Sequence, residues 1–340
     1  METEFLRAGT PGHIERAAQI LREGGLVGIP TETVYGLAAN ALDGNACARI
    51  FEAKGRPVDN PLIVHISELS QWDTLVREIP ENARRLAEAY WPGPLTIILP
   101  KAECIPDAVS PGLDTVSVRF PAHPVAKAVI SAAGVPLAAP SANLSGRPSP
   151  TTAGHVWHDL KGRIEAVLDG GECGVGVEST VVSLACNPPR LLRPGGITLE
   201  QLEAVLGPVF VDPAVTHPLA EGAKAASPGM KYKHYAPRVP VKIVEGSGEA
   251  YIRFVNGRAC EGAAALCYDG DASELRVPFV CYGQEDDPER QARELFDALR
   301  RLDELDAKIV YARCPPPEGV GLAVYNRLIR AAGFEVIHID

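Results

Sequence analysis

The sequence predicts an α/β protein built from two domains. The chain has 340 residues, and a domain commonly holds about 100–200. Strand-like and helix-like patterns alternate along most of its length, which is typical of a sheet covered by helices. The alternation stops in residues 208–240, a segment rich in proline, glycine and alanine that we interpret as an interdomain linker. We therefore predict domains over residues 1–207 and 241–340.

The first predicted element is an amphipathic helix over residues 13–23. Counted from Ile14, its apolar residues recur at i, i+3, i+4 and i+7. A glycine pair ends this helix, and the apolar run 26–29 predicts the strand that follows. The remaining helices of the domain are predicted over residues 45–53, 82–90, 124–133, 152–160 and 199–206, and the remaining strands over 62–66, 95–99, 115–120, 166–168, 179–184 and 190–193.

Apolar and polar residues alternate in the predicted strand 115–120. This period of two places Thr115, Ser117 and Arg119 on one face of the strand. That face either is solvated on the outside of the domain or forms the polar floor of a cavity. The pattern alone does not choose between these alternatives.

The chain after the linker shows a second series of alternating elements. Strands are predicted over residues 241–244, 264–268, 278–282, 309–311 and 335–339, with helices over 288–305 and 321–332. This order predicts a smaller, doubly wound, Rossmann-like domain. Gly319 and Gly321 follow a strand, but Val324 occupies the place of a third glycine, so a dinucleotide-binding fingerprint is not supported.

Composition and charge narrow the possible functions. The formal net charge is -10, which favours a small-molecule substrate over direct work on RNA. The N-terminus lacks a hydrophobic signal core, and no apolar run approaches the ~18 residues that span a bilayer, so we expect a cytoplasmic protein without membrane contact. Eight scattered cysteines show no Cys-x-x-Cys spacing, and the sequence therefore predicts no metal site.

The residues from Lys54 to His65 form the most informative segment. Lys54 and Arg56 stand two residues apart on a turn that glycine and proline shape, and Asn60 follows. A stiff loop that presents a lysine and an arginine ahead of a strand suits an anionic, phosphorylated ligand. A surface turn with two solvated charges remains the alternative. No P-loop motif is present, so a P-loop NTPase is not predicted.

Several motifs occur together with this segment, in a fixed order along the chain. Two of them directly follow apolar runs in the first half, and the last lies in the linker. They are residues 30–37 (PTETVYGL), 141–146 (SANLSG), 177–181 (VESTV), 192–195 (LRPG) and 227–237 (SPGMKYKHYAP). Together they resemble the YrdC/Sua5 family of threonylcarbamoyl-AMP synthases, and the linker motif marks its two-domain Sua5 type. The resemblance covers nearly the whole chain and implies a twisted mixed sheet with helices around a concave site, followed by a smaller Sua5 domain.

The resemblance also implies an activity. The family joins L-threonine, bicarbonate or CO2, and ATP into L-threonylcarbamoyl-AMP and pyrophosphate, with Mg²⁺ accompanying ATP. The product is passed to the tRNA threonylcarbamoyl-transferase machinery for N6-threonylcarbamoyladenosine at tRNA position 37, so the enzyme itself does not require tRNA binding.

Site residues are carried over from the resemblance position by position. Lys54 and Arg56 are expected to be catalytic. The residues expected to contact L-threonine are Thr33, His65, Arg119, Ala139 through its backbone, and Ser179. Those expected to contact ATP are Lys54, Arg56, Asn60, Thr115, Ser141, Asn143, Ser149, Arg193, Tyr232 and Tyr235.

The linker motif predicts a lid. Residues 231–235 carry two lysines, a histidine and two tyrosines, which is more aromatic than an inert spacer. We expect Tyr232 or Tyr235 to touch the nucleotide and the segment to exclude water from labile intermediates. Packing of the tyrosines onto a domain is the alternative. Two other functions stay open, an RNA-binding or ribosome-maturation module with a YrdC-like fold and a carbamoyl transferase.

Overall fold

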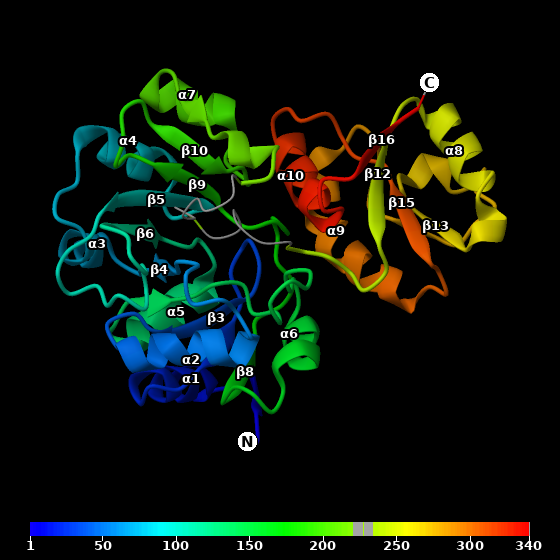
Figure 1. The fold of residues 1–340 in the computed structure, drawn as a ribbon. Helices are drawn as coiled ribbons and strands as arrows, with labels where there is room; N and C mark the ends of the chain where they lie inside the picture. The colour runs from blue at the N-terminus through cyan, green and yellow to red at the C-terminus, as the bar shows by residue number, and fades with distance from the viewer. Residues whose placement is uncertain (220–226, 228–233, 340) are drawn as a thin grey trace. The chain divides into compact units, whose positions relative to one another are not determined.

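The computed structural model describes residues 1–219, 227 and 234–339, which divide into two compact units (Figure 1). Most of the chain up to Val215 belongs to the first unit. The second contains residues 146–148, 216–218 and, from residue 234 on, the rest of the described chain. Both units combine strands and helices, so the predicted α/β class is confirmed.

An eleven-stranded mixed sheet is the framework of the first unit within the described residues. Its order from edge to edge is β1-β8-β2-β3-β7-β4-β6-β5-β9-β10-β11. Parallel and antiparallel neighbours both occur, for example β4 with β6 and β5 with β6. The strands are β1 (Glu4–Arg7), β2 (Val27–Ile29), β3 (Gly36–Asn40), β4 (Ile63–His65), β5 (Leu95–Pro100), β6 (Thr115–Arg119), β7 (Leu137–Ala138), β8 (Ala166–Asp169), β9 (Thr180–Ser183), β10 (Arg190–Arg193) and β11 (Phe210–Val211).

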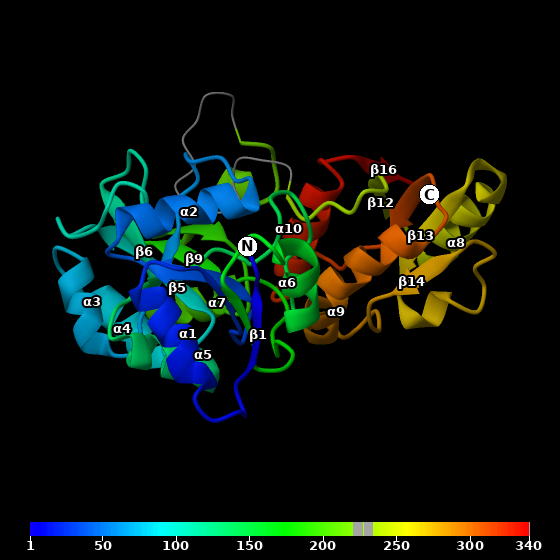
Figure 2. The ribbon, with the colours of Figure 1, turned by 90° about the horizontal axis from the view of Figure 1, so that it is seen from below.

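Helices cover the two faces of this sheet differently. On one face, apolar residues of five helices pack on the strands in a single large core; these are α2 (Gly44–Lys54), α3 (Leu69–Leu75), α4 (Glu81–Tyr90), α6 (Ala153–Leu160) and α7 (Leu199–Leu206). On the other face, α1 (His13–Arg22) and α5 (Pro124–Ala133) lie side by side (Figure 2) and form a second core with β1, β8, β2, β3 and β7. This second core does not include the strands beyond β7, which leaves part of that face for polar residues.

The second unit contains a parallel five-stranded sheet in the order β14-β13-β15-β12-β16. Its strands are β12 (Val241–Glu245), β13 (Ala263–Cys267), β14 (Phe279–Cys281), β15 (Ile309–Ala312) and β16 (Val336–His338). Helix α8 (Gly248–Asn256) covers one face, and α9 (Pro288–Arg301) and α10 (Gly321–Ala331) cover the other (Figure 1). The predicted Rossmann-like architecture is therefore present.

Several elements differ from the prediction. The strands β1, β3, β7 and β11 and the helices α3 and α8 were not anticipated. Strand β3 has the sequence Gly-Leu-Ala-Ala-Asn, without the β-branched and aromatic residues that favour a strand, and it forms because buried neighbours on both sides pair with it. Strand β11 extends the first sheet beyond Gly207, into the segment predicted as linker. Helix α9 ends at Arg301 and continues only as a short 3₁₀ turn, Leu302–Glu304.

No helix within the described ranges is both long and apolar enough to cross a membrane.

Candidate active site

A row of polar side chains crosses neighbouring strands of the first sheet. His65 on β4 is paired in register with Arg119 on β6, and Arg119 is paired with Thr96 on β5. Residues that face each other across a sheet point to the same side. The row therefore combines three segments that lie far apart in the sequence.

This row lies on the face that α1 and α5 leave uncovered. Val116 and Val118 of β6 point into the large core on the opposite face, so the alternating Ser117 and Arg119 point toward the row. Both are only 4% exposed. The alternative of a solvated outer face is therefore wrong, and the polar side of this strand lies inside the unit.

Arg119 connects the row to the loop that follows β2. Its Nη1 donates a hydrogen bond to Thr33 Oγ1 (2.8 Å), and its Nη2 lies 2.7 Å from Glu32 Oε1. Burial by itself raises the pKa of Glu32, but the charge and hydrogen bond of Arg119 outweigh it and hold that pKa below its usual value. The buried guanidinium is thus balanced by an ionised carboxylate.

His65 is a neutral imidazole in this environment. Its Nδ1 lies 3.1 Å from the carbonyl oxygen of Ile63, and its ring is 3% exposed. Burial, together with the positive charge of Arg119, lowers the pKa of His65 to about 3. At neutral pH the ring therefore offers hydrogen bonds without adding a second positive charge beside Arg119.

A second arginine lies at the β9–β10 side of the row. Arg193 Nε donates to the carbonyl oxygen of Ser179 (3.0 Å), and its Nη2 donates to Ser179 Oγ (3.1 Å). Ser179 Oγ also lies 2.8 Å from Thr96 Oγ1. All three residues are at most 6% exposed, so the two hydroxyls and the guanidinium form a buried hydrogen-bonded chain.

Lys54 holds the turn that follows β7. Helix α2 ends at this lysine because Gly55 adopts a left-handed conformation (φ 62°) that suits glycine. The Lys54 ammonium donates to the carbonyl oxygens of Ser141 and of Asn143, the latter at 2.5 Å, and lies 3.4 Å from Asn143 Oδ1. Lys54 is only 2% exposed, so its ammonium is a buried cation in contact with two other predicted site residues, Ser141 and Asn143.

Arg56 and Asn60 shape the loop between α2 and β4. Arg56 Nη2 donates to the carbonyl oxygens of Asn60 (3.3 Å) and Pro61 (3.1 Å). The Asn60 side chain is 1% exposed, yet neither its Oδ1 nor its Nδ2 has a hydrogen-bond partner within the described residues. A buried amide without partners is unfavourable, which marks Asn60 as a side chain suited to an additional ligand.

Backbone hydrogen bonds join the motif loops into one body. Tyr35 N donates to the carbonyl oxygen of Pro150, and Ala142 N donates to that of Tyr35, both at 2.8 Å. Val175 N donates to Glu32 O, also at 2.8 Å. Residues 30–35, 139–145, 149–150 and 175–180 of the first unit are therefore held together, with Ser149 Oγ and Glu178 Oε1 2.5 Å apart.

Most of the predicted site residues belong to these contacts. Thr33 meets Arg119, His65 faces Arg119, and Ser179 meets Arg193, while Lys54 binds the Ser141–Asn143 turn. The backbone N–H of Ala139 donates to Ile63 O at 2.9 Å. These contacts locate the residues, whereas their predicted roles toward L-threonine and ATP stay predictions.

Two predicted ATP contacts, Thr115 and Tyr235, lie outside the contacts described above. Thr115 begins β6 opposite Pro100, four residues from Arg119 and thus roughly 13 Å along the strand. Tyr235 belongs to the second unit, where it is 5% exposed and its ring lies 5.2 Å from that of Phe296. Tyr235 thus packs within the second unit, and its predicted contact with ATP stays a prediction. Tyr232 lies outside the described residues.

Sequence reasoning missed Glu32, Thr96 and Glu178. Glu32 and Glu178 directly precede predicted site residues in their motifs, so an acidic residue at such a position could have indicated that they belong to the site. Thr96 gave a weaker signal, a single hydroxyl within the apolar strand Leu95–Pro100. Only the pairing of β5 with β6 and β9 shows that its hydroxyl meets Ser179.

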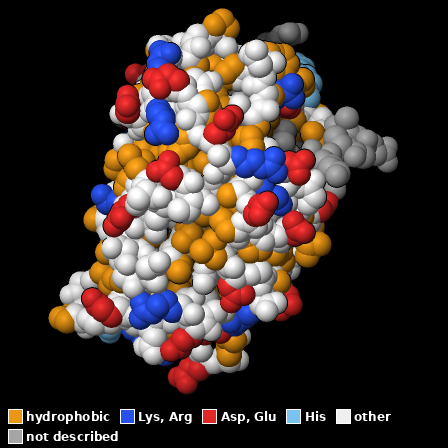
Figure 3. All heavy atoms as spheres, turned by 90° about the vertical axis from the view of Figure 1, so that its left-hand side faces the viewer, with side chains coloured by type: hydrophobic (Ala, Val, Ile, Leu, Met, Phe, Trp, Pro, Cys, Tyr) orange, Lys and Arg blue, Asp and Glu red, His pale blue; other side chains and the backbone are white. Residues whose placement is uncertain are grey.

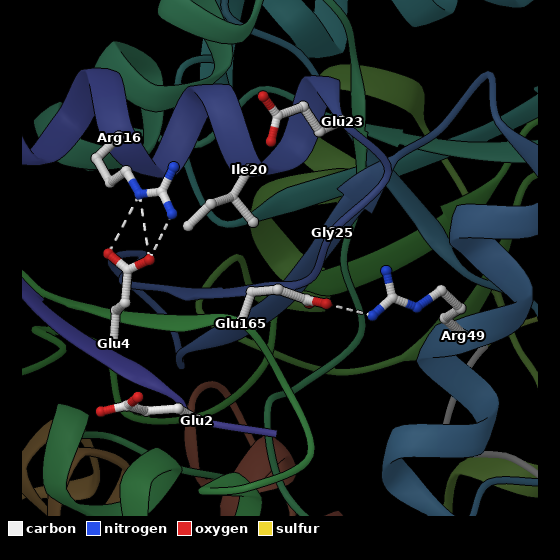
Figure 4. Close-up of a pocket in the computed structure, with 8 residues that line it drawn as sticks. All are labelled: Glu2, Glu4, Arg16, Ile20, Glu23, Gly25, Arg49 and Glu165. Atoms are coloured by element: carbon white, nitrogen blue, oxygen red, sulfur yellow. Dashed lines mark hydrogen bonds and ion pairs between the residues drawn. The ribbon is translucent and has the colours of Figure 1, made fainter.

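A separate pocket lies between α1, α2 and the segment before β8. Figure 4 shows two ion pairs among its charged side chains: Arg16 binds Glu4, with Nη2 2.6 Å from Oε1, and Arg49 binds Glu165. Its lining includes none of the predicted site residues. We therefore interpret it as an ion-paired surface hollow.

The surface drawn in Figure 3 shows basic and acidic side chains interspersed. It presents no continuous basic area of the kind that tracks a nucleic-acid backbone.

Comparisons with known proteins agree with the fold and the motifs. A Sua5/YciO/YrdC family model described as "Telomere recombination" matches residues 19–195, and one described as "Threonylcarbamoyl-AMP synthase, C-terminal domain" matches residues 197–333. Proteins named threonylcarbamoyl-AMP synthase are 49% identical to this chain in Pyrococcus abyssi (96% of each chain covered) and 49% identical in Bacillus subtilis (98% and 97% covered). The crystal structure of P. abyssi Sua5 complexed with L-threonine has a TM-score of 0.91 at 46% identity and covers 100% of both chains.

The chain belongs to the Sua5/YrdC family. Both family models match in sequence order, so its domain composition is that of the two-domain Sua5 type.

Proposed function

We propose that this chain synthesises L-threonylcarbamoyl-AMP and pyrophosphate from L-threonine, bicarbonate or CO2, and ATP. The observation that carries the proposal is the buried contact of Arg119 with Thr33 beside a neutral His65. A buried guanidinium with hydroxyls next to it suits the carboxylate and hydroxyl of a small amino acid. The relatives named threonylcarbamoyl-AMP synthase support the same activity.

Arg119 is the proposed anchor for the threonine carboxylate. Its guanidinium contacts the carbonyl oxygen of Gly93 (3.4 Å), Thr33 Oγ1 and Glu32 Oε1. A guanidinium has five N–H groups, so two remain for a bound carboxylate. Thr33, His65, Ser179 and the backbone of Ala139 are the other proposed threonine contacts.

The remaining cations are proposed to bind ATP. Lys54, Arg56 and Arg193 supply positive charge without a P-loop, and Asn60 offers a buried amide with unused hydrogen-bonding capacity. Several donors are needed because the charged triphosphate loses its hydration on binding. The other proposed ATP contacts are Thr115, Ser141, Asn143, Ser149, Tyr232 and Tyr235.

The chemistry requires positioning and charge stabilisation more than a covalent nucleophile. The amine of threonine attacks CO2 to form a carbamate, the carbamate oxygen attacks the α-phosphorus of ATP, and pyrophosphate leaves. Lys54 and Arg56 are proposed to stabilise the negative charge that develops during this transfer.

Magnesium is proposed to enter with the nucleotide. No group of three or more His, Cys, Asp or Glu side chains able to hold a metal ion occurs in the described part of the chain. This fits an ion that binds mainly phosphate oxygens and water, as Mg²⁺ commonly does in nucleotide sites. Bound there, it would supply charge neutralisation on the phosphates.

The product is an activated acyl group, so a transferase must consume it. We propose that it serves N6-threonylcarbamoyladenosine formation at tRNA position 37 and that this chain need not bind tRNA.

Pyrophosphate release tests the proposed function. ATP is supplied with and without L-threonine and bicarbonate, using wild type, Arg56→Ala and, as a matched control, Arg85→Ala, whose side chain is exposed on α4. Release that depends on both cosubstrates, that falls in Arg56→Ala and that persists in Arg85→Ala is the expected result. Salt-sensitive retention of tRNA without threonine-dependent release would favour the RNA-binding alternative instead.

A further inference from the structure

Glu32 is an acidic residue of the site to which no motif-based role was assigned. It precedes Thr33 in the loop after β2, and its side chain is 15% exposed. Its Oε1 lies 2.7 Å from Arg119 Nη2. The carboxylate therefore stands directly beside the group proposed to bind the substrate carboxylate.

The Glu32 carboxylate retains unused capacity to accept hydrogen bonds. The backbone amides of Glu32 and Ala122 favour its anionic form. Even so, neither carboxylate oxygen accepts a hydrogen bond of good geometry within the described residues, and both atoms are shielded from solvent. A shielded anion in this state is well placed to accept a hydrogen bond from a bound cation.

Free L-threonine supplies such a cation. At neutral pH it is a zwitterion, in which the ammonium is bonded to the carbon that carries the carboxylate. A carboxylate held by the free N–H groups of Arg119 brings its ammonium close to Glu32, because the two protein charges are themselves in contact. One cation and one anion, side by side and buried, match the two charges of an amino acid.

We propose that Glu32 is a substrate-binding residue that accepts a hydrogen bond from the α-ammonium of L-threonine and so selects a zwitterionic amino acid. This inference rests on the proposed function. In the ligand-free state the same carboxylate neutralises Arg119, which would otherwise be a buried unpaired charge.

The proposal separates binding from chemistry. The amine must lose its proton before it attacks CO2, so an anion that stabilises the ammonium contributes to binding and not to the chemical step. Substitution of Glu32 should therefore raise the KM for L-threonine without lowering kcat.

The test compares two ligands on three proteins. L-threonine and its 2-hydroxy analogue, in which a hydroxyl replaces the ammonium, are titrated calorimetrically into wild type, Glu32→Gln and Glu172→Gln. Glu172 provides the control because it is exposed in a neighbouring loop. Glu32→Gln is expected to weaken L-threonine binding about ten- to hundredfold, as loss of a hydrogen bond between charged groups does, and to change binding of the analogue much less.

Other outcomes overturn the proposal. Equal weakening of both ligands would make Glu32 only a support for Arg119, and unchanged L-threonine binding would remove it from the site. A wild type that neither binds L-threonine nor releases pyrophosphate would refute the proposed function itself, a result distinct from either. If Glu32→Gln does not fold, the wild type still decides: the pKa of the amine of bound ¹⁵N-labelled L-threonine should lie above that of the free amino acid, and a lower value contradicts the proposal.

Discussion

Acidification should destabilise the first unit through His65. The pKa of this buried imidazole is lowered to about 3, from 6.5 in an unfolded chain. Between these values the unfolded state binds a proton that the folded state does not, so stability falls as the pH falls. The contribution of His65 is fully present above about pH 6.5 and is lost progressively toward pH 3.

The loss of unfolding free energy follows from how far the pH lies below the pKa of His65 in the unfolded chain. A pH of 5 lies 1.5 units below the unfolded-state pKa of 6.5, and each unit corresponds to about 1.4 kcal/mol per proton. Wild type should therefore lose about 2 kcal/mol of unfolding free energy between pH 7 and pH 5 through this residue alone. Because His65 is 3% exposed, solvent screening does not reduce this figure appreciably.

Tryptophan fluorescence during urea unfolding reports the stability of the first unit, which contains His65. The chain has three tryptophans, Trp72, Trp91 and Trp157, and all three belong to the first unit. In His65→Asn the loss between pH 7 and pH 5 should be smaller than in wild type by about 2 kcal/mol, whereas His158→Asn, exposed on α6, should behave like wild type. Equal pH dependence in His65→Asn and wild type would refute the assignment of a buried neutral imidazole.

Three further predictions concern the same site. A methyl group on Gly195 would lie 2.3 Å from Thr180 N and 2.5 Å from Glu178 O, and these backbone atoms cannot move aside. Gly195→Ala should therefore lower the free energy of unfolding in urea by at least about 3 kcal/mol. Gly174→Ala, where a methyl group would meet nothing within 4 Å, should be near neutral, and similar losses in both variants would contradict the packing argument. Thr96→Val removes one hydrogen bond to Ser179 and should cost about 1 kcal/mol by the same measurement, so an unchanged midpoint would argue against that bond. Lys54→Met should reduce threonine-dependent pyrophosphate release about a hundredfold or more, while the exposed Lys161→Met should retain it, and wild-type rates in Lys54→Met would exclude the lysine from the site.

Local patterns predicted most of the regular elements of the fold. Helix α1 follows from its apolar stripe, and β6 from the alternation around Val116 and Val118. The elements that were missed depend on neighbours: β3 is a strand because it pairs with β2 and β7, although its Gly-Leu-Ala-Ala-Asn sequence has little strand preference.

Motif resemblance predicted much of the membership of the candidate site, and burial of Lys54, Arg119 and Arg193 agrees with it. It could not predict the contacts of Glu32 and Thr96. Neither residue has a local pattern that distinguishes it from a solvated acid or a strand hydroxyl. Their partners come from segments more than 80 residues away along the chain, Arg119 for Glu32 and Ser179 for Thr96.

The order of residues along this chain already fixed its α/β class, its two-part organisation and its family, since periodicity and motif order are properties of the chain itself. Charge pairing, protonation and exposure in the site were decided by the folded unit. Register between β4, β6 and β5 aligns His65, Arg119 and Thr96, and the apolar cover of α1 and α5 stops short of them. Those are consequences of long-range packing. Burial and the charge of Arg119 keep the imidazole neutral, and the charge and hydrogen bond of Arg119 keep the Glu32 carboxylate ionised despite its burial.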